Sequence, residues 1–293
     1  MEEKLLELEA PSPENVMRLV ANEVPFVMRG LCRDWPALAK WDFPYLTRML
    51  KETPGKVYKG TFRTREGVLP DEIPTHEAVR HVLYHEDNFR IVENMAIWLS
   101  AQSNVTTMHY DGYSFDGFNV QVKGHKAFVL CHPDLECVMA PFLQGAVPHA
   151  KDEEARRRVT SYTVEMRPGD CLYTPRFWYH TVTARADSAN VQYHFARKKP
   201  PSVESRAMRH YINNAWIVAN SPYLIPRAIR EGISEYVDIV ELYAAKARPQ
   251  EARLQAIDAL VTMVTHVVAK PLMTTKLLRQ YRRRTLDELG KPL

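Results

Sequence analysis

Cysteine is scarce in this chain, and its pattern excludes two classes of protein. The 293 residues include four cysteines, Cys32, Cys131, Cys137 and Cys171. They are too few and too scattered for a disulfide framework, and no two form a CxxC pair, so a thiolate zinc site is not expected. We interpret them as small buried apolar side chains in a reducing, intracellular compartment, either cytoplasmic or nuclear.

Long apolar runs are also missing. No stretch approaches the roughly 20 residues that a membrane-spanning helix needs, so we expect no membrane contact. The N-terminal segment MEEKLLELEAPSPEN is acidic and soon interrupted by prolines, unlike a signal peptide. Hydrophobic residues make up 45% and charged residues 25% of the chain, values that are typical of globular proteins and exclude intrinsic disorder.

A large excess of one charge is absent too. The chain carries 39 basic and 35 acidic residues, a net charge of +4, which is weak evidence for a polyanionic partner. The exception is KLLRQYRRR at 276–284, which has several basic residues and no acidic one. This segment is either a solvated helix face or a contact surface for RNA, chromatin or an acidic protein.

Composition divides the chain into three zones. Residues 1–24 predict a helical lead-in, with Ser12 as the N-terminal cap before Pro13. Residues 25–199 carry short β-like runs between turns, which favours a sandwich or barrel over a parallel α/β fold. The predicted strands are 25–29, 119–123, 127–131, 162–166, 171–175, 180–184 and 190–195, with helical or irregular segments at 43–52 and 75–86.

The third zone, 200–293, is predicted to be helical. One of its helices places an apolar stripe along one face, from Leu254 to Val268. This stripe could pair two protomers into a homodimer or pack against the rest of the same chain.

A His-x-Asp unit, His109-Tyr110-Asp111, is the most informative motif. On an extended backbone residues two apart face the same side, so the imidazole and the carboxylate converge while Tyr110 points away. A second histidine would complete a two-His, one-carboxylate triad, the pattern of non-haem Fe(II) oxygenases. His180, which follows the turn RPGD and the segment TPRFWY, is the candidate. Since the chain has 11 histidines, the unit alone is weak evidence.

The context of this unit resembles a known family. SNVTTMHYD, QVKGHKAFVLCHP and RPGDCLYTPRFWYHTV together resemble the Jumonji C (JmjC) domain of the cupin-fold 2-oxoglutarate oxygenases. PFVMRGLCRDWPALAKW resembles the lead-in of the small JmjC hydroxylases, so the resemblance covers roughly residues 20–200. It implies a mainly β fold with helices, a double-stranded β-helix (cupin or jelly-roll) barrel at 25–199 followed by a C-terminal helical segment.

The resemblance also assigns roles to individual residues. It implies that His109, Asp111 and His180 are the ligands of Fe(II). The other matching positions concern the cosubstrate 2-oxoglutarate. Lys126 would pair with its distal carboxylate, Thr106 would donate a hydrogen bond to the same group, and Asn119 would line the pocket. The offset from His109 to Lys126 is most similar to the lysyl-hydroxylase branch of the family.

The implied activity is hydroxylation of a protein or peptide side chain, coupled to O₂-dependent decarboxylation of 2-oxoglutarate to succinate and CO₂. Lysine or arginine demethylation uses the same chemistry, but the chain lacks room for histone-reading modules and has no cysteine-rich zinc site. A hydroxylase of a tRNA base stays open because of the basic segment 276–284. A cupin that binds metal or a partner without turnover is the alternative from another class.

Two positions depart from the family pattern. The strand after His180 carries Gln192 and His194, where the family has a small polar residue that faces the cosubstrate or oxygen. His194 is either a group that supports the metal ligands or a core histidine satisfied by hydrogen bonds. Several aromatic residues could likewise line a substrate groove or belong to the core: Tyr110, Tyr113, Phe115, Trp178 and Tyr179.

Overall fold

The computed structural model defines most of the first 208 residues. The described residues are 2–58, 61–89, 91, 94–111, 115–136, 138–139, 146–147, 157–199 and 205–208. The predictions for the helical zone 200–293, apart from 205–208, concern residues outside this set. The apolar stripe, the homodimer, the basic segment 276–284, Tyr113 and Cys137 therefore stay as they were predicted from sequence.

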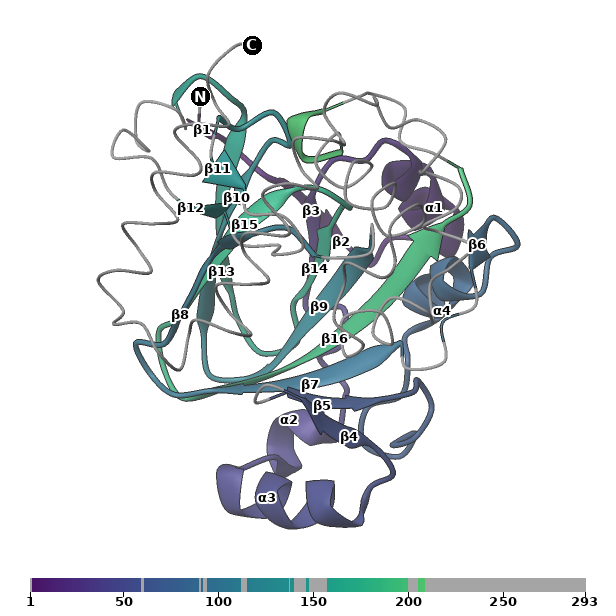
Figure 1. Cartoon of the computed structure of the whole chain (residues 1–293). Helices are drawn as coiled ribbons and strands as arrows, with labels where there is room; N and C mark the ends of the chain where they lie inside the picture. Colours follow the sequence, from purple (N-terminus) through teal and green to yellow (C-terminus); the bar gives the residue numbers. More distant parts are fainter. Residues whose placement is uncertain are drawn as a thin grey trace, which may run out of the picture.

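Two β-sheets form the body of the protein (Figure 1). The larger sheet has the order β2 (Leu6–Glu9), β3 (Phe26–Arg29), β14 (Cys171–Thr174), β9 (Asp116–Lys123), β16 (Ser188–Arg197), β7 (Met95–Ser100), β5 (Thr61–Thr64), β4 (Lys56–Tyr58), and β6 (Asn88–Phe89) pairs with β16. The smaller sheet has the order β1 (Glu2–Glu3), β13 (Ser161–Met166), β10 (Lys126–Cys131), β15 (Tyr179–Ala184), β8 (Val105–His109). A separate short pair joins β11 (Val138–Met139) and β12 (Ala146–Val147).

The path of the chain between these sheets is that of a double-stranded β-helix. β7, β9, β14 and β16 are neighbours in the larger sheet, and β8, β10, β13 and β15 are neighbours in the smaller one. Pairing within each set of four is antiparallel, as in a jelly roll. The predicted cupin fold is confirmed. In the described part of the chain the two sheets form no continuous ring of paired strands, so the double-stranded β-helix is made of two facing sheets.

Each of the seven predicted strands is present, every one with a different start or end, whereas several others, among them β4–β8, were not predicted. β7 reads MAIWLS and β8 reads VTTMH, neither of which alternates regularly enough to be recognised. The lead-in prediction was wrong for residues 2–3 and 6–9, which are strands that pair in parallel with β13 and β3. Whether strands this short form depends on their pairing partners, which are far away in sequence. Their own residues therefore show little of the sequence pattern that would predict a strand.

Helices cover the outer face of the larger sheet. They are α1 (Pro13–Ala21), α2 (Ala37–Lys40), α3 (Phe43–Glu52) and α4 (Glu77–Leu83). Ser12 caps α1 as predicted, by accepting a hydrogen bond from the backbone N–H of Asn15 at 3.2 Å. Buried residues of α1, α3 and α4 pack against apolar side chains of β9 and β16 in the main core. None of the helices among the described residues is long and apolar enough to cross a membrane.

The alternation along β9 and β16 determines what faces the space between the sheets. Phe118, Val120, Val191 and Tyr193 belong to the core beneath the helices. The residues between them point the other way, and these are polar: Asn119, Gln121, Asn190, Gln192 and His194 are all buried. Buried polar side chains are rare unless they hydrogen-bond or serve a site, so the polar inner face marks the functional cavity.

The turn between β9 and β10 holds these strands close to a neighbouring loop. Gly124 has φ +68°, a left-handed conformation that glycine adopts without strain. A Cβ at Gly124 would lie 2.2 Å from the carbonyl oxygen of Asp187, so a side chain has no room there. This turn places Lys126 at the first position of β10.

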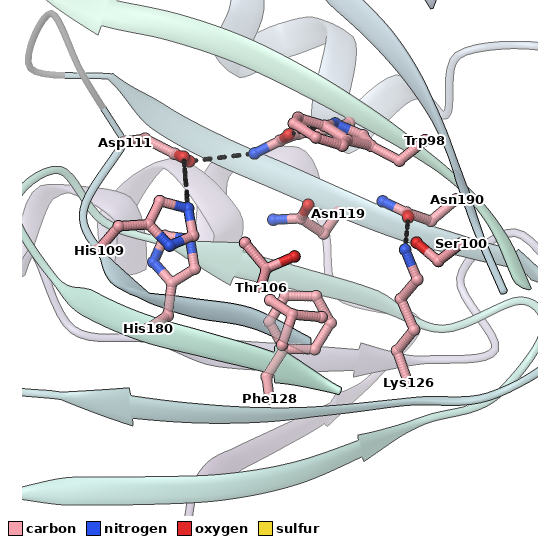
Figure 2. Close-up of a pocket in the computed structure, with 12 residues that line it drawn as sticks. Trp98, Ser100, Thr106, His109, Asp111, Asn119, Lys126, Phe128, His180 and Asn190 are labelled. Atoms are coloured by element: carbon pink, nitrogen blue, oxygen red, sulfur yellow. Dashed lines mark hydrogen bonds and ion pairs between the residues drawn. The ribbon is translucent and has the colours of Figure 1, made fainter. Parts of the chain in front are cut away.

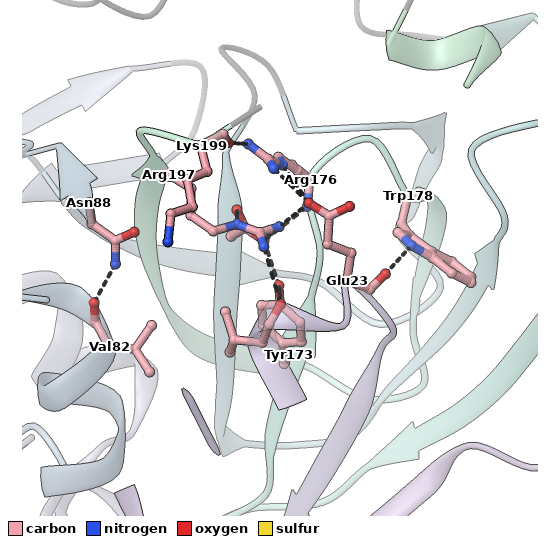
Figure 3. Close-up of polar contacts among 10 residues, drawn as sticks. Glu23, Val82, Asn88, Tyr173, Arg176, Trp178, Arg197 and Lys199 are labelled. Carbon is pink, nitrogen blue, oxygen red and sulfur yellow. Dashed lines mark hydrogen bonds and ion pairs between the residues drawn. The ribbon is translucent and has the colours of Figure 1, made fainter. Parts of the chain in front are cut away.

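A buried cluster of charges fastens the segment after α1 to the larger sheet (Figure 3). Arg197 donates from Nε and Nη2 to Asp116 at 3.1 Å each, and its Nη2 lies 2.9 Å from Glu23. Arg176 donates to the same Glu23 at 2.6 Å, and the hydroxyl of Tyr173 donates to Asp116 at 2.5 Å. Each of these charges has an opposite partner, as buried charges require.

Candidate active site

A cavity of about 50 Å³ lies between the two sheets (Figure 2). Since a water molecule occupies at least 10–15 Å³ by this measure, the cavity has room for several waters or a small ligand. Residues from β7, β8, β9, β10, β15 and β16 line it. All six residues singled out from the sequence are among them: Thr106, His109, Asp111, Asn119, Lys126 and His180.

Three of these residues converge at one end of the cavity. One ligand atom from each of His109, Asp111 and His180 lies within 4.8 Å of the other two. Asp111 Oδ1 is 3.9 Å from His109 Nε2 and 3.8 Å from His180 Nε2. The two imidazole rings have centroids 4.2 Å apart. The structure thus brings the predicted two-His, one-carboxylate set together from β8, the residues after it, and β15.

The H-x-D unit has the predicted geometry. His109 is the last residue of β8, and its side chain and that of Asp111 point into the cavity. Tyr110 between them points away into a second core cluster, where its ring packs against Phe177 and Tyr179. The buried tyrosine anchors the backbone between the two cavity-facing side chains.

His180 is held in one tautomer. Its Nδ1 lies 3.1 Å from the carbonyl oxygen of Trp178, and since a carbonyl only accepts, Nδ1 carries the proton. Nε2, which faces Asp111, is then left with a free lone pair, the form that binds a metal. Burial, together with the nearby His109, lowers the pKa of His180 to about 4, so the ring is neutral at pH 7.

Asp111 is ionised at the same pH. Burial opposes ionisation, but electrostatic interactions with His180, His194, His109 and Arg63 outweigh it, so the pKa of this carboxyl lies below its usual value of 3.8. A carboxylate beside a neutral imidazole with a free lone pair provides two kinds of metal ligand at neutral pH.

Lys126 lies at the other end of the cavity (Figure 2). Its side chain is 5% exposed, and its ammonium group donates a hydrogen bond to Asn190 Oδ1. In the described part of the chain no carboxylate lies within ion-pair distance of it. Burial lowers the pKa of Lys126 to about 8, so the amine is mostly protonated at pH 7.

A bulge in β8 brings Thr106 to the same cavity as His109. His109 pairs with His180 and Thr106 with Val182, so between these pairs two residues of β8 oppose one of β15. The extra residue turns both side chains towards the cavity, although they are three positions apart. Thr106 lies exposed, whereas Asn119 on β9 is buried and donates a long hydrogen bond to Thr174 at 3.4 Å.

Three further cavity residues make polar contacts: Asn190, Gln192 and Trp98. The sequence marked Gln192 only as a departure from the family pattern, without a role, and did not single out Asn190 or Trp98. Asn190 accepts from Lys126. Gln192 donates to Asp111 Oδ2 at 3.0 Å and accepts from Trp98 Nε1 at 2.8 Å. The polar alternation of β16, Asn190-x-Gln192, was the signal that could have identified the first two, while nothing local distinguishes Trp98 in its unpredicted strand.

The remaining expectations concern buried side chains. The described aromatic residues Tyr110, Phe115, Trp178 and Tyr179 are at most 5% exposed, so they belong to the core and not to a surface groove. His194 is also buried, with its ring 5.3 Å from that of Phe115. Burial lowers the pKa of His194 to about 4. The three described cysteines are free and buried, as expected: Cys32, Cys131 and Cys171.

Comparisons with known proteins agree with this architecture. Residues 69–200 match the model of a family described as a cupin-like domain. The chain is 23% identical over 236 residues to Jumonji C domain-containing protein 5 of Drosophila melanogaster, covering 64% of this chain and 58% of that protein. It is 32% identical over 100 residues to the HSPB1-associated protein 1 homolog of Danio rerio, covering 29% of this chain and 22% of that protein.

The chain thus spans less than two thirds of the length of either relative. The matched segment contains β7–β10 and β13–β16, the strands of the double-stranded β-helix, together with every residue of the His/Asp/His cluster. Residues 69–200 are therefore similar to cupin-like domains, and the chain is similar over 64% of its length to a Jumonji C domain-containing protein.

Proposed function

We propose that this protein is an Fe(II)- and 2-oxoglutarate-dependent oxygenase that hydroxylates a side chain of a protein or peptide. One observation carries the proposal. A cavity between two sheets has a His/Asp/His cluster at one end and, at the other, a buried lysine that has no carboxylate partner among the described residues. The first end suits a divalent metal and the second suits an anion, and 2-oxoglutarate has to reach both.

The donor set fits Fe(II). Two nitrogens and one carboxylate oxygen are the ligands of the facial triad of non-haem iron oxygenases. An ion about 2.1 Å from each ligand atom allows at most about 4.2 Å between two of them. The spacings of 3.9 and 3.8 Å from Asp111 Oδ1 to the two imidazoles lie within this limit, and they would shorten to roughly 3 Å when the three groups bind one ion as adjacent ligands.

The far end of the cavity fits a carboxylate. A buried ammonium group without a counter-ion is costly, and an anion beside it forms a charge-assisted hydrogen bond. Asn190 supports Lys126 from the opposite sheet, and Thr106 provides a hydroxyl at the exposed side. These groups would bind the distal carboxylate of 2-oxoglutarate and orient the keto acid towards the His/Asp/His cluster.

When bound, iron and 2-oxoglutarate supply the oxidation, which consumes O₂, releases succinate and CO₂ and transfers one oxygen atom to a C–H bond. The chain contributes binding and orientation. His109, Asp111 and His180 would hold the metal on one face. The apolar side chains of Phe128 and Val182 line the cavity and limit the entry of water.

The choice of a protein or peptide substrate rests on the resemblance of the lead-in to the small JmjC hydroxylases. Lysine or arginine demethylation and hydroxylation of a tRNA base would use the same residues, and the cavity does not distinguish them. A cupin that binds metal without turnover is disfavoured by Lys126, since a metal-binding scaffold alone has no need of a buried cation.

The test is succinate formation from 2-oxoglutarate by the full chain with Fe(II), ascorbate and O₂, offered basic peptides, protein extracts and tRNA. We expect succinate above the background, and its loss in His109→Ala and Asp111→Ala. His85→Ala is the matched control, because His85 pairs with Asp87 outside the cavity. Far-ultraviolet circular dichroism should be unchanged in all three variants, since a catalytic metal is not needed for folding.

Two results would contradict the proposal. Equal succinate formation by His109→Ala and the unmodified protein would exclude the metal assignment. If no succinate forms, 2-oxoglutarate binding should be measured in the presence of Mn(II). Absence of binding would then favour the cupin without turnover.

A further inference from the structure

A pair of hydrogen bonds ties one candidate metal ligand to the larger sheet. Gln192, on β16, donates from Nε2 to Asp111 Oδ2 at 3.0 Å. Its Oε1 accepts a hydrogen bond from Trp98 Nε1, on β7, at 2.8 Å. The resulting chain of hydrogen bonds runs from Trp98 through Gln192 to Asp111, and its two end residues, Trp98 and Asp111, lie at the upper side of the cavity in Figure 2.

The indole determines which way the Gln192 amide points. An indole N–H only donates, so the group facing it has to be the amide oxygen. The amide NH₂ then faces Asp111, whose carboxylate only accepts. Without Trp98 the two ends of the amide could exchange places, and the oxygen would face the carboxylate with no proton between them.

The bond also separates the two oxygens of Asp111. Oδ2 is held by Gln192, whereas Oδ1 lies 3.9 and 3.8 Å from Nε2 of His109 and His180. A carboxylate anchored in this manner offers one oxygen to a metal. The second oxygen is kept away, which preserves the three open positions of a facial triad.

We propose that Gln192, oriented by Trp98, is a positioning residue that fixes Asp111 as a one-oxygen ligand, a role that rests on the proposed metal site. Residues that hydrogen-bond a metal ligand from behind typically change metal affinity 10- to 100-fold when they are replaced. Gln192 would act in this way through Asp111, without touching the metal.

The local packing leaves space for this arrangement. Gly117, on β9, lies directly beside the Gln192–Asp111 bond. A Cβ there would be 3.3 Å from Gln192 Nε2 and 3.6 Å from Asp111 Oδ2, closer to the amide than most Cβ contacts in proteins. Gly117→Ala should therefore disturb the same bond from the opposite side, without removing either partner.

The experiment measures Mn(II) affinity of the full chain, from the electron paramagnetic resonance signal of free Mn(II). Gln192→Met keeps an unbranched side chain of similar length and removes the donor. We expect it to bind Mn(II) about tenfold or more weakly. Trp98→Phe keeps an aromatic ring and removes the N–H, so we expect a smaller loss. Gln121→Met is the matched control, because Gln121 is a buried glutamine on β9 that does not line the cavity and whose amide donates to the Lys123 carbonyl oxygen.

The outcomes separate this inference from the proposed function. Weaker Mn(II) binding in Gln192→Met and Trp98→Phe, but not in Gln121→Met, would support the positioning role. Unchanged affinity in both test variants, with loss of binding in His109→Ala, would overturn it and leave the metal site intact. Equal Mn(II) binding by the unmodified protein and His109→Ala would overturn the proposed metal site and this inference with it. If Gln192→Met fails to fold, Trp98→Phe and Gly117→Ala carry the test.

Discussion

Lys126 and Asn190 join the two sheets across the cavity. Lys126 belongs to β10 of the smaller sheet and donates to the side-chain oxygen of Asn190 on β16 of the larger sheet. Both residues are buried, with exposed fractions of 5% and 4%. The amide solvates the ammonium group in part but does not neutralise it, so the contact leaves a positive charge available to an anion.

Replacing this lysine should stabilise the protein that has no cosubstrate bound. Burial lowers the pKa of Lys126 from its usual 10.5 to about 8. The protonated form is therefore penalised by roughly 3 kcal/mol at pH 7 relative to the unfolded chain. Lys126→Met removes this penalty but leaves Asn190 without its donor, so we expect a net gain of about 1–3 kcal/mol in the free energy of unfolding, measured by urea denaturation.

The pH dependence of the same variant provides the check. The penalty is fully present below pH 8 and disappears as pH rises from 8 to 10.5, because the lysine is then neutral in both states. The stability difference between Lys126→Met and the unmodified protein should shrink over that interval. A variant that is less stable than the unmodified protein at pH 7 would mean that the buried charge has a partner.

Binding of 2-oxoglutarate should weaken at alkaline pH. The protonated lysine binds an anion and the neutral lysine does not, so the dissociation constant should be constant below pH 8. Above pH 8 it should rise by up to about tenfold per pH unit, until the pKa of the lysine in the complex is reached. Equilibrium dialysis with Mn(II)-loaded protein measures this. Lys126→Met should bind weakly with no inflection near pH 8; an inflection retained in this variant would assign it to another group.

Much of the cavity could be predicted because its residues follow local motifs. His109-Tyr110-Asp111 is one contiguous segment, and so is the turn before β14. The side-chain directions within such a segment follow from the local backbone conformation alone. Lys126 follows a glycine turn. The resemblance then paired His180 with the first two ligands, and β8 and β15 do lie side by side.

What could not be predicted depends on contacts between distant strands. The bulge that turns Thr106 towards the cavity exists only in the pairing of β8 with β15. The Trp98–Gln192 bond joins residues 94 positions apart. β1 and β2 are too short to show a periodic pattern, and they form because sheet edges are available to them. A glutamine and a tryptophan in isolation carry no sign of such a partnership.

The charge cluster around Asp116 and Arg197 should contribute strongly to stability. Asp116 is fully buried and accepts from Arg197 and Tyr173, so Asp116→Ala leaves Arg197 with only part of its compensation. Breaking a buried pair typically costs about 3–5 kcal/mol, and we expect a loss of this size in urea denaturation.

The control for this prediction is Asp87→Ala. Asp87 pairs with Lys199 at 3.1 Å on the surface, where the two side chains are 47% and 75% exposed. Exposed pairs contribute little, so this variant should unfold almost like the unmodified protein. Equal effects of the two substitutions would show that burial does not determine the contribution of these pairs.

Asn190→Asp should weaken the binding of 2-oxoglutarate at the Lys126 end of the cavity. The substitution keeps the shape of the side chain but places a carboxylate beside the ammonium group of Lys126, where the amide oxygen lies now. The lysine would then be neutralised internally, and its pKa would rise because the new charge favours the protonated form. We expect the dissociation constant for 2-oxoglutarate to increase by about tenfold or more, since one charge-assisted bond is worth about 1.5–3 kcal/mol. Mn(II) affinity should stay the same, because the His/Asp/His cluster lies at the opposite end.

Asn190→Ala, which removes the amide without adding a charge, should weaken 2-oxoglutarate binding less. If Asn190→Asp binds 2-oxoglutarate as tightly as the unmodified protein, the distal carboxylate does not bind at Lys126, and the cosubstrate has to be oriented by another cation.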